Sequence, residues 1–116
     1  MKAEFMYDSR SDDLYIYGAQ KSHGSIELGE NIIIDFDANM NVVALEFLDA
    51  SKALGYLTGK RITKKFLKTI KNAGFYSERK GGLSFTFFKI VFADNKSISE
   101  KLTMQDLKYK SPVLAR

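Results

Sequence analysis

The sequence of 116 residues contains no cysteine and only one proline and one histidine. The absence of cysteine excludes disulfide bonds, thiolate metal ligands and cysteine nucleophiles. No apolar run approaches the ~18 residues that a membrane-spanning helix needs. Glu4 and Asp8 interrupt the stretch in which a secretory signal would carry its apolar run. We therefore expect a cytoplasmic protein that has no membrane partner.

A linker rich in proline or glycine is also missing, so we expect a single domain over residues 1–116. Hydrophobic residues make up 45% of the sequence and charged residues 28%, which is ordinary for a globular protein. A chain of this length can bury about two-thirds of its unfolded surface, which predicts a real core. Within the domain we expect an N-terminal β part at 1–55, and a helix followed by strands at 56–116.

Charge is distributed unevenly along the chain. Residues 1–59 carry 4 Lys and Arg against 10 Asp and Glu, and residues 60–116 carry 14 against 4, so the two parts have net charges of −6 and +10. A basic half is typical of a surface that binds nucleic acid, but opposite halves of one small domain also attract each other and a second copy.

The stretch at 31–51 predicts a hairpin around which the rest of the chain is organised. Apolar residues alternate with other residues in both of its strands, as in strands with one buried face. The two apolar faces consist of Ile32, Ile34, Phe36, Val43, Leu45 and Phe47. Between the strands, Asn39 and Asn41 tolerate the left-handed backbone of a tight reversal. Shorter strands are predicted at 2–7, 14–17 and 25–28, and we expect all five to form an antiparallel meander.

Four motifs of this N-terminal part resemble the domain of unknown function 2283 family over roughly residues 4–55. They are Tyr7-Asp8, Asp13 to Ile16, Ile33 to Asp37 and Val42 to Ser51. The family usually shows a glycine where this chain has Met40, and the resemblance leaves residues 56–116 unmatched. It implies a small antiparallel β module, often encoded beside small toxin-like proteins in prokaryotes, with no established catalytic residues.

Two helical segments are predicted after the hairpin. Residues 49–55 fit one or two turns, with Asp49 or Ser51 as the N-cap. A clearer helix is predicted to begin after the N-cap Thr63 and to end at Gly74. Its polar face carries lysines, and the basic residues of this region are candidates for nucleic-acid binding. They are Lys60, Arg61, Lys64, Lys65, Lys68 and Lys71.

Three strands are predicted to follow, at 75–78, 83–93 and 97–104. The longest of them, 83–93, has large apolar residues on both faces, so it needs cover on both sides. We predict that a second copy supplies part of this cover, and the candidate interface residues are Phe85, Phe87, Phe88, Ile90 and Phe92. The alternative is that the N-terminal sheet covers the strand within one chain. Pro112 predicts an extended tail along the surface.

Candidate sites for chemistry are weak. Asp35, Asp37, Asn39 and Glu46 have the spacing of a calcium-binding loop, but Met40 stands where that loop needs glycine and the flanks are predicted strands. Asp35 could pair with Asp37 or Glu46 for acid–base work, although acidic residues on a solvent-facing strand are far commoner. His23 lies in a polar loop without a nucleophile motif. We expect no metal, no cofactor and no catalytic residue.

The overall expectation is an α+β fold with an antiparallel meander and hairpins, one main helix and a C-terminal antiparallel extension of the sheet, or alternatively three C-terminal strands that face the first sheet. The expected function is a non-enzymatic protein-interaction module that forms a homodimer or binds a small protein partner. The alternative is weak, sequence-nonspecific binding of nucleic acid through the basic helix, since lysine-rich faces read bases poorly.

Overall fold

The structure is a computed structural model that describes residues 3–105. It has an α+β fold made of two antiparallel sheets and one main helix, which confirms the predicted fold class. The first sheet contains β1 (Glu4–Asp8), β2 (Asp13–Tyr17), β3 (Gly24–Leu28), β4 (Ile32–Phe36) and β5 (Val42–Phe47). Two helices follow, α1 (Ala50–Thr58) and α2 (Lys64–Leu67). The second sheet contains β6 (Ile70–Lys80), β7 (Leu83–Phe92) and β8 (Ser97–Gln105).

The first sheet is not the expected meander, because its strand order is β1-β2-β5-β4-β3. The hairpin of β4 and β5 forms as predicted, but β2 pairs with β5, so that Ile16 lies opposite Leu45. This order puts the most apolar strands in the middle of the sheet and leaves the more polar β1 and β3 at its edges. Exposed edges of this kind are common in β proteins because polar edge strands resist unwanted pairing.

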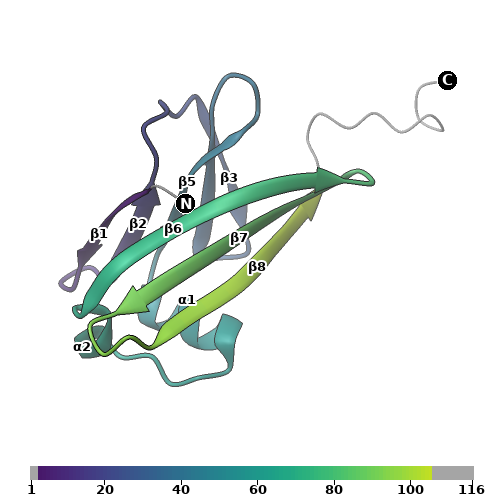
Figure 1. The fold of residues 1–116 in the computed structure, drawn as a ribbon. Helices are drawn as coiled ribbons and strands as arrows, with labels where there is room; N and C mark the ends of the chain where they lie inside the picture. The colour runs from purple at the N-terminus through teal and green to yellow at the C-terminus, as the bar shows by residue number, and fades with distance from the viewer. Residues whose placement is uncertain (1–2, 106–116) are drawn as a thin grey trace, which may run out of the picture.

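The second sheet does not extend the first one but faces it, and the two share one hydrophobic core (Figure 1). In Figure 1 the three long strands cross in front of the first sheet, and β6 packs against β1 and β2. The predicted apolar residues of β4 and β5 are all buried, and all except Val43 belong to this core. A register shift between Asp35 and Phe36 pairs Phe36 with Val42, so Val42 packs against the core where Val43 was expected. From the second sheet, Phe88 contributes a ring that lies 5.1 Å from that of Phe47. Both parts of the chain therefore build the same interior.

The N-terminus of α1 is capped by a residue that the sequence did not indicate. Asp49 is the N-cap by position, but its side chain makes no capping hydrogen bond. Instead the Asp12 carboxylate, from the turn between β1 and β2, accepts hydrogen bonds from the backbone N–H of Ser51 at 3.2 Å and from its hydroxyl at 2.6 Å. The Tyr7 hydroxyl donates to the same carboxylate at 2.7 Å. Asp12 is 4% exposed. Because Asp12 binds both Tyr7 of β1 and Ser51 of α1, it connects these two elements.

The helix predicted from Thr63 to Gly74 ends much earlier. Thr63 is its N-cap, with Oγ1 accepting from the backbone N–H of Phe66 at 3.1 Å, as predicted. The helix nevertheless stops at Leu67, and Gly74 lies inside β6. The reason is tertiary: β6 is hydrogen-bonded to β7 along its length, and Ala73 is buried opposite Ile90. Sheet pairing here overrides a helical pattern, as packing commonly overrides local propensity.

The C-terminal strands form where the sequence predicted them, although β6 begins earlier than expected. The tail after Gln105, with Pro112, lies outside the described residues. Among residues 3–105, neither helix has the length and the apolar content that crossing a bilayer requires.

Candidate functional site

The outer face of the second sheet is the surface that the fold leaves uncovered. Along β7, Ser84, Thr86 and Phe88 are buried against the first sheet, so the alternating residues between them point outward. The outward set of the three strands contains Tyr76, Glu78, Lys80, Leu83, Phe85, Phe87, Lys89, Val91, Ser99, Lys101 and Thr103. This surface, which we call the outer face, points toward the viewer in Figure 1.

Aromatic rings occupy the middle of the outer face. Tyr76 and Phe87 lie on neighbouring strands, and their rings are stacked with centroids 4.9 Å apart and planes 15° from parallel. Tyr76 remains 49% exposed, so one side of this pair is open to solvent. Phe85 is half-buried two residues along β7, and the Lys101 ammonium lies 5.2 Å from the centre of its ring. The arrangement offers flat apolar surfaces beside a cation.

Positive charge surrounds these rings. Lys80, Lys89 and Lys101 project from β6, β7 and β8, and Glu78 is the acidic residue among the outward set. A shallow hollow of about 500 Å³ lies beside the stacked pair, and its polar lining consists of two lysines, one serine and one glutamate, namely Lys89, Lys101, Ser99 and Glu100. The outer face therefore combines stacking surfaces with cations and hydroxyl groups, which suits an anionic partner that carries flat rings.

The predicted interface residues divide between the two faces of β7. Phe85 and Phe87 lie on the outer face, where another molecule can reach them. Phe88, Ile90 and Phe92 are at most 2% exposed, because the first sheet and α2 cover them within one chain. These three residues cannot contact a partner while the chain keeps this fold. The alternative expectation, cover by the N-terminal sheet, thus holds for the inner side of the strand.

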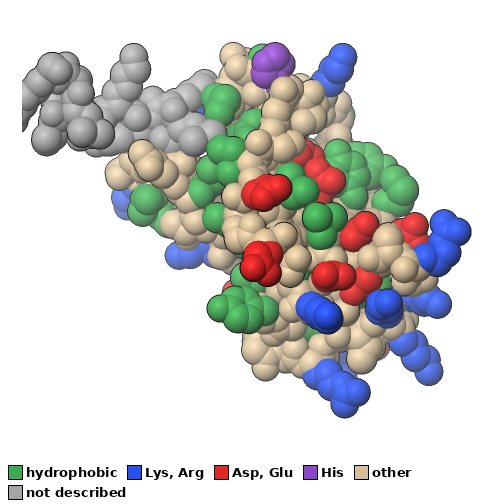
Figure 2. Space-filling view, turned by 180° about the vertical axis from the view of Figure 1, so that it is seen from behind, with side chains coloured by type: hydrophobic (Ala, Val, Ile, Leu, Met, Phe, Trp, Pro, Cys, Tyr) green, Lys and Arg blue, Asp and Glu red, His purple; other side chains and the backbone are tan. Residues whose placement is uncertain are grey.

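The predicted nucleic-acid residues are exposed, but they do not share one helix face. Lys60 and Arg61 lie in the loop before α2, Lys64 and Lys65 lie in its only turn, Lys68 is its C-cap and Lys71 belongs to β6. The Lys71 ammonium donates a hydrogen bond to the side chain of Asn95. Figure 2 shows Lys and Arg side chains gathered at the end of the molecule where Figure 1 places α2. They form a basic end beside the second sheet, and no recognition helix exists there.

The opposite side of the molecule, formed by the first sheet, is acidic. Figure 2 views this side and shows Asp and Glu side chains across it. The strand register places on it Glu4, Asp8, Asp13, Glu27, Asp35 and Glu46. The two broad sides of the protein thus carry opposite charge. The sequence showed that charge is uneven along the chain, but it did not show which face carries which charge.

One of the carboxylate pairs that the sequence suggested does form on the acidic side. Asp35 and Glu46 are diagonal neighbours on β4 and β5, and Asp35 is 4% exposed. The hydroxyl of Ser25 donates to Asp35 Oδ1 at 2.5 Å. Burial, the hydrogen bond with Asp35 and the negative charge of Asp35 and Asp13 raise the pKa of Glu46 to about 7. Both side chains lie on the acidic side of the first sheet.

The other residues that the sequence suggested as candidates for chemistry either stabilise a turn or lie exposed in a loop. Asp37 Oδ1 accepts hydrogen bonds from the backbone N–H groups of Asn39 and Asn41, both at 2.9 Å, and so closes the turn between β4 and β5. Met40 takes the left-handed backbone there, with φ 65°, a conformation that glycine adopts at lower cost. His23 is exposed, as expected. Within residues 3–105 no three His, Asp or Glu side chains converge as metal ligands.

Comparison with known proteins covers less than half of the chain. Over 54 residues the chain is 46% identical to an uncharacterized protein of Methanocaldococcus jannaschii, a stretch that makes up 45% of each protein. The chain therefore spans less than half of that relative's length. No solved structure is significantly similar to this chain. Residues 5–51, which run from β1 to the start of α1, match the family described as protein of unknown function (DUF2283).

Proposed function

We propose that the protein is a non-enzymatic binding module whose outer face holds single-stranded nucleic acid without sequence preference. The observation that supports this most is the open stack of Tyr76 on Phe87, flanked by Phe85 and Lys101. Bases stack on exposed aromatic rings for about 1–3 kcal/mol each, whatever their sequence, and lysines beside the rings neutralise phosphates. A sheet surface that carries aromatic residues is a recurrent way of binding single strands.

The spacing of the rings fits more than one base. Phe85 and Phe87 are two residues apart on the same strand, which separates them by about 7 Å. The side of Tyr76 that faces away from Phe87 is the natural place for one base, and the ring of Phe85 for a second. Lys89 follows Phe87 by two residues on β7, and Lys101 lies opposite Phe87 on β8, so both are near enough to the rings to reach the connecting phosphates.

Duplex DNA fits this surface less well. A protein usually reads duplex DNA by inserting a helix or a two-stranded ribbon into the major groove. The outer face belongs to a three-stranded sheet, and α2 has four residues, which is too short to lie along a major groove. The lysines of the basic end then supply additional phosphate contacts, which depend on charge alone.

Homodimerisation through the same face is a second candidate. Leu83 is 42% exposed and Val91 is half-buried, so part of the outer face is apolar and would gain from cover. Packing two copies face to face would, however, bring Lys89 and Lys101 near the same residues of the second copy, and like charges at an interface cost free energy. A small protein partner with an acidic surface would avoid this repulsion.

The test is the affinity for a fluorescein-labelled oligothymidine of 20 nucleotides, measured by fluorescence anisotropy at several salt concentrations. We expect Tyr76→Ala to weaken binding at least fivefold, which corresponds to about 1 kcal/mol for one lost stacking surface. Tyr56→Ala is the matched control, since Tyr56 is 90% exposed on α1, away from the outer face. The control should bind as tightly as the unchanged protein.

Two results would refute this proposal. One is an oligonucleotide affinity that Tyr76→Ala leaves unchanged. Any binding would then come from the attraction of phosphates by lysines and not from stacking of bases. The other is a light-scattering mass of twice 13.2 kDa that Leu83→Asp returns to 13.2 kDa, together with no oligonucleotide binding. That combination would establish the homodimer as the use of the outer face.

A further inference from the structure

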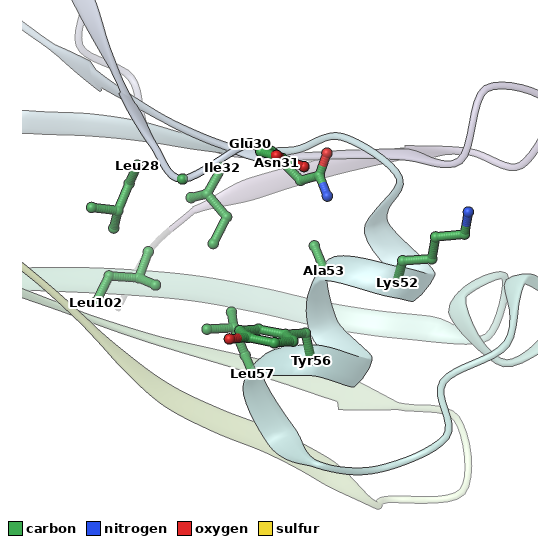
Figure 3. A pocket seen from close by; sticks show the side chains of 10 residues that line it. Leu28, Glu30, Asn31, Ile32, Lys52, Ala53, Tyr56, Leu57 and Leu102 are labelled. Atoms are coloured by element: carbon green, nitrogen blue, oxygen red, sulfur yellow. The ribbon is translucent and has the colours of Figure 1, made fainter.

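We propose that the protein has a separate binding site for a small, planar, mostly apolar and uncharged molecule between its two sheets. The site is a pocket of about 650 Å³, bounded by the turn between β3 and β4, by α1 and by the inner side of β8 (Figure 3). Pockets of 300–1,000 Å³ with mainly apolar walls and few polar groups are typical of small-molecule sites. No residue of the outer face takes part, so this inference goes beyond the proposed function.

The packing of the two sheets explains why the pocket exists. β6 lies against β1 and β2, which closes the space between the sheets on that side. On the opposite side β3 and β8 are the edge strands, and the short helix α1 fills only part of the gap between the layers. The floor of the pocket is therefore made by core side chains, Ile32, Ala53 and Leu102, each at most 8% exposed. Half-buried Leu28 and Leu57 form its walls.

An unpacked aromatic ring stands at the mouth of this pocket. Tyr56 lines the pocket and is 90% exposed, the highest value among the large hydrophobic residues that remain exposed in the described part of the chain. In Figure 3 its ring stands beside Leu57, and the side chains of Leu28, Ile32 and Leu102 lie across the opening from it. A flat ligand inserted there would have one face on the Tyr56 ring and the other on aliphatic side chains. Aromatic pairs of this kind contribute about 0.5–1.5 kcal/mol beyond the area that they bury.

The polar groups at the rim favour a ligand without net charge. Lys52 and Glu30 both line the pocket, and neither forms an ion pair or a side-chain hydrogen bond with residues 3–105. Because one cation and one carboxylate flank the same opening, a ligand of either charge would be attracted by one and repelled by the other. Asn31, at the same rim, can donate or accept a hydrogen bond. A planar apolar molecule with one hydroxyl or amide group satisfies all of these features.

The experiment uses three naphthalene probes on the full-length protein, namely 2-naphthol, 2-naphthoate and 2-naphthylmethylammonium. Binding is followed by amide chemical shifts in two-dimensional NMR spectra. We expect 2-naphthol to cause saturable shifts in residues 28–32 and 53–57, and to bind more tightly than either charged probe. Tyr56→Ala should weaken its binding about three- to tenfold, whereas Tyr76→Ala, which removes an exposed ring from the outer face, should have no effect.

Three results, each read from the shifts of residues 28–32 and 53–57, would overturn the inference. They are the absence of saturable shifts there at 2 mM 2-naphthol, a charged probe that binds there more tightly than 2-naphthol, and an affinity there that Tyr56→Ala does not change. The two tyrosine variants serve as controls for each other, so failure at the pocket is distinguishable from failure at the outer face.

Discussion

Replacing Asp12 by alanine is expected to lower the free energy of unfolding by about 3 kcal/mol. The carboxylate is buried and accepts hydrogen bonds from Tyr7 and from the backbone and hydroxyl of Ser51, and alanine would leave these donors without a partner. Hydrogen bonds to a charged group are worth about 1.5–3 kcal/mol, and loss of a helix N-cap alone costs about 1 kcal/mol. Urea denaturation followed by circular dichroism measures the change.

Asp49→Ala provides a matched control for this experiment. Asp12 and Asp49 both have a left-handed backbone, with φ 58° and φ 48°, so alanine meets the same backbone strain at each. Asp49, however, is exposed and makes no capping hydrogen bond. If Asp49→Ala destabilises the protein as much as Asp12→Ala does, the backbone conformation and not the carboxylate network determines the loss.

The same network predicts a change at Tyr7. Burial, its hydrogen bond to Asp12 and the negative charge nearby raise the pKa of the Tyr7 hydroxyl above its ordinary value of 10.0. Removing the Asp12 carboxylate should therefore lower the pKa of Tyr7 toward that value. This shift separates loss of the network from a general loosening of the fold.

The second large effect is a dependence of stability on pH that arises from Glu46. The pKa of Glu46 is about 7 in the folded protein, against 4.5 for an ordinary glutamate, so the folded state holds the proton more tightly. Its favourable contribution is complete below pH 4.5 and is lost as the pH rises through about 7. After allowance for the solvent that reaches Glu46, we expect the loss to be about 1–2 kcal/mol.

Glu46→Gln should remove this dependence. Glutamine can donate a hydrogen bond to Asp35 at any pH, as the protonated carboxyl does, so the variant should be about 1–2 kcal/mol more stable than the unchanged protein at pH 8 and similar at pH 5. Glu27→Gln is the control, because Glu27 lies on the same side of the sheet but on the edge strand β3, where it is exposed. Parallel stability curves for the unchanged protein and Glu46→Gln between pH 5 and pH 8 would contradict the account.

Local patterns in the sequence predicted most of the strands and the fold class. The alternation around Ile34 and Leu45 identified the central hairpin and its buried faces, and both residues are fully buried. The order of the strands could not be predicted in the same way. It depends on the pairing of β2 with β5, across a gap in sequence that contains two other strands, and nothing local distinguishes this from a meander.

The candidate site was only partly predictable, for a related reason. The strand at 83–93 showed that Phe85 and Phe88 face opposite ways, but the sequence could not tell which face the rest of the chain would cover. The role of Tyr76 was missed because its stack on Phe87 depends on the register between β6 and β7. Asp12 was missed as a cap because its partner Ser51 lies 39 residues away. The signal in the sequence that could have indicated this site was the alternation of Phe85 and Phe87 in β7, with Lys89 in the same strand and Lys101 in β8.

The most direct measurement of the proposed activity is an NMR titration of the full-length protein with a short oligothymidine. If the outer face binds single strands, the largest amide shifts will fall at Tyr76, Phe85, Phe87, Lys89 and Lys101, and ring protons of Tyr76 will move upfield as bases stack on them. Shifts confined to the lysines of the basic end, residues 60–71, with no change at Tyr76 or Phe85, would contradict the account.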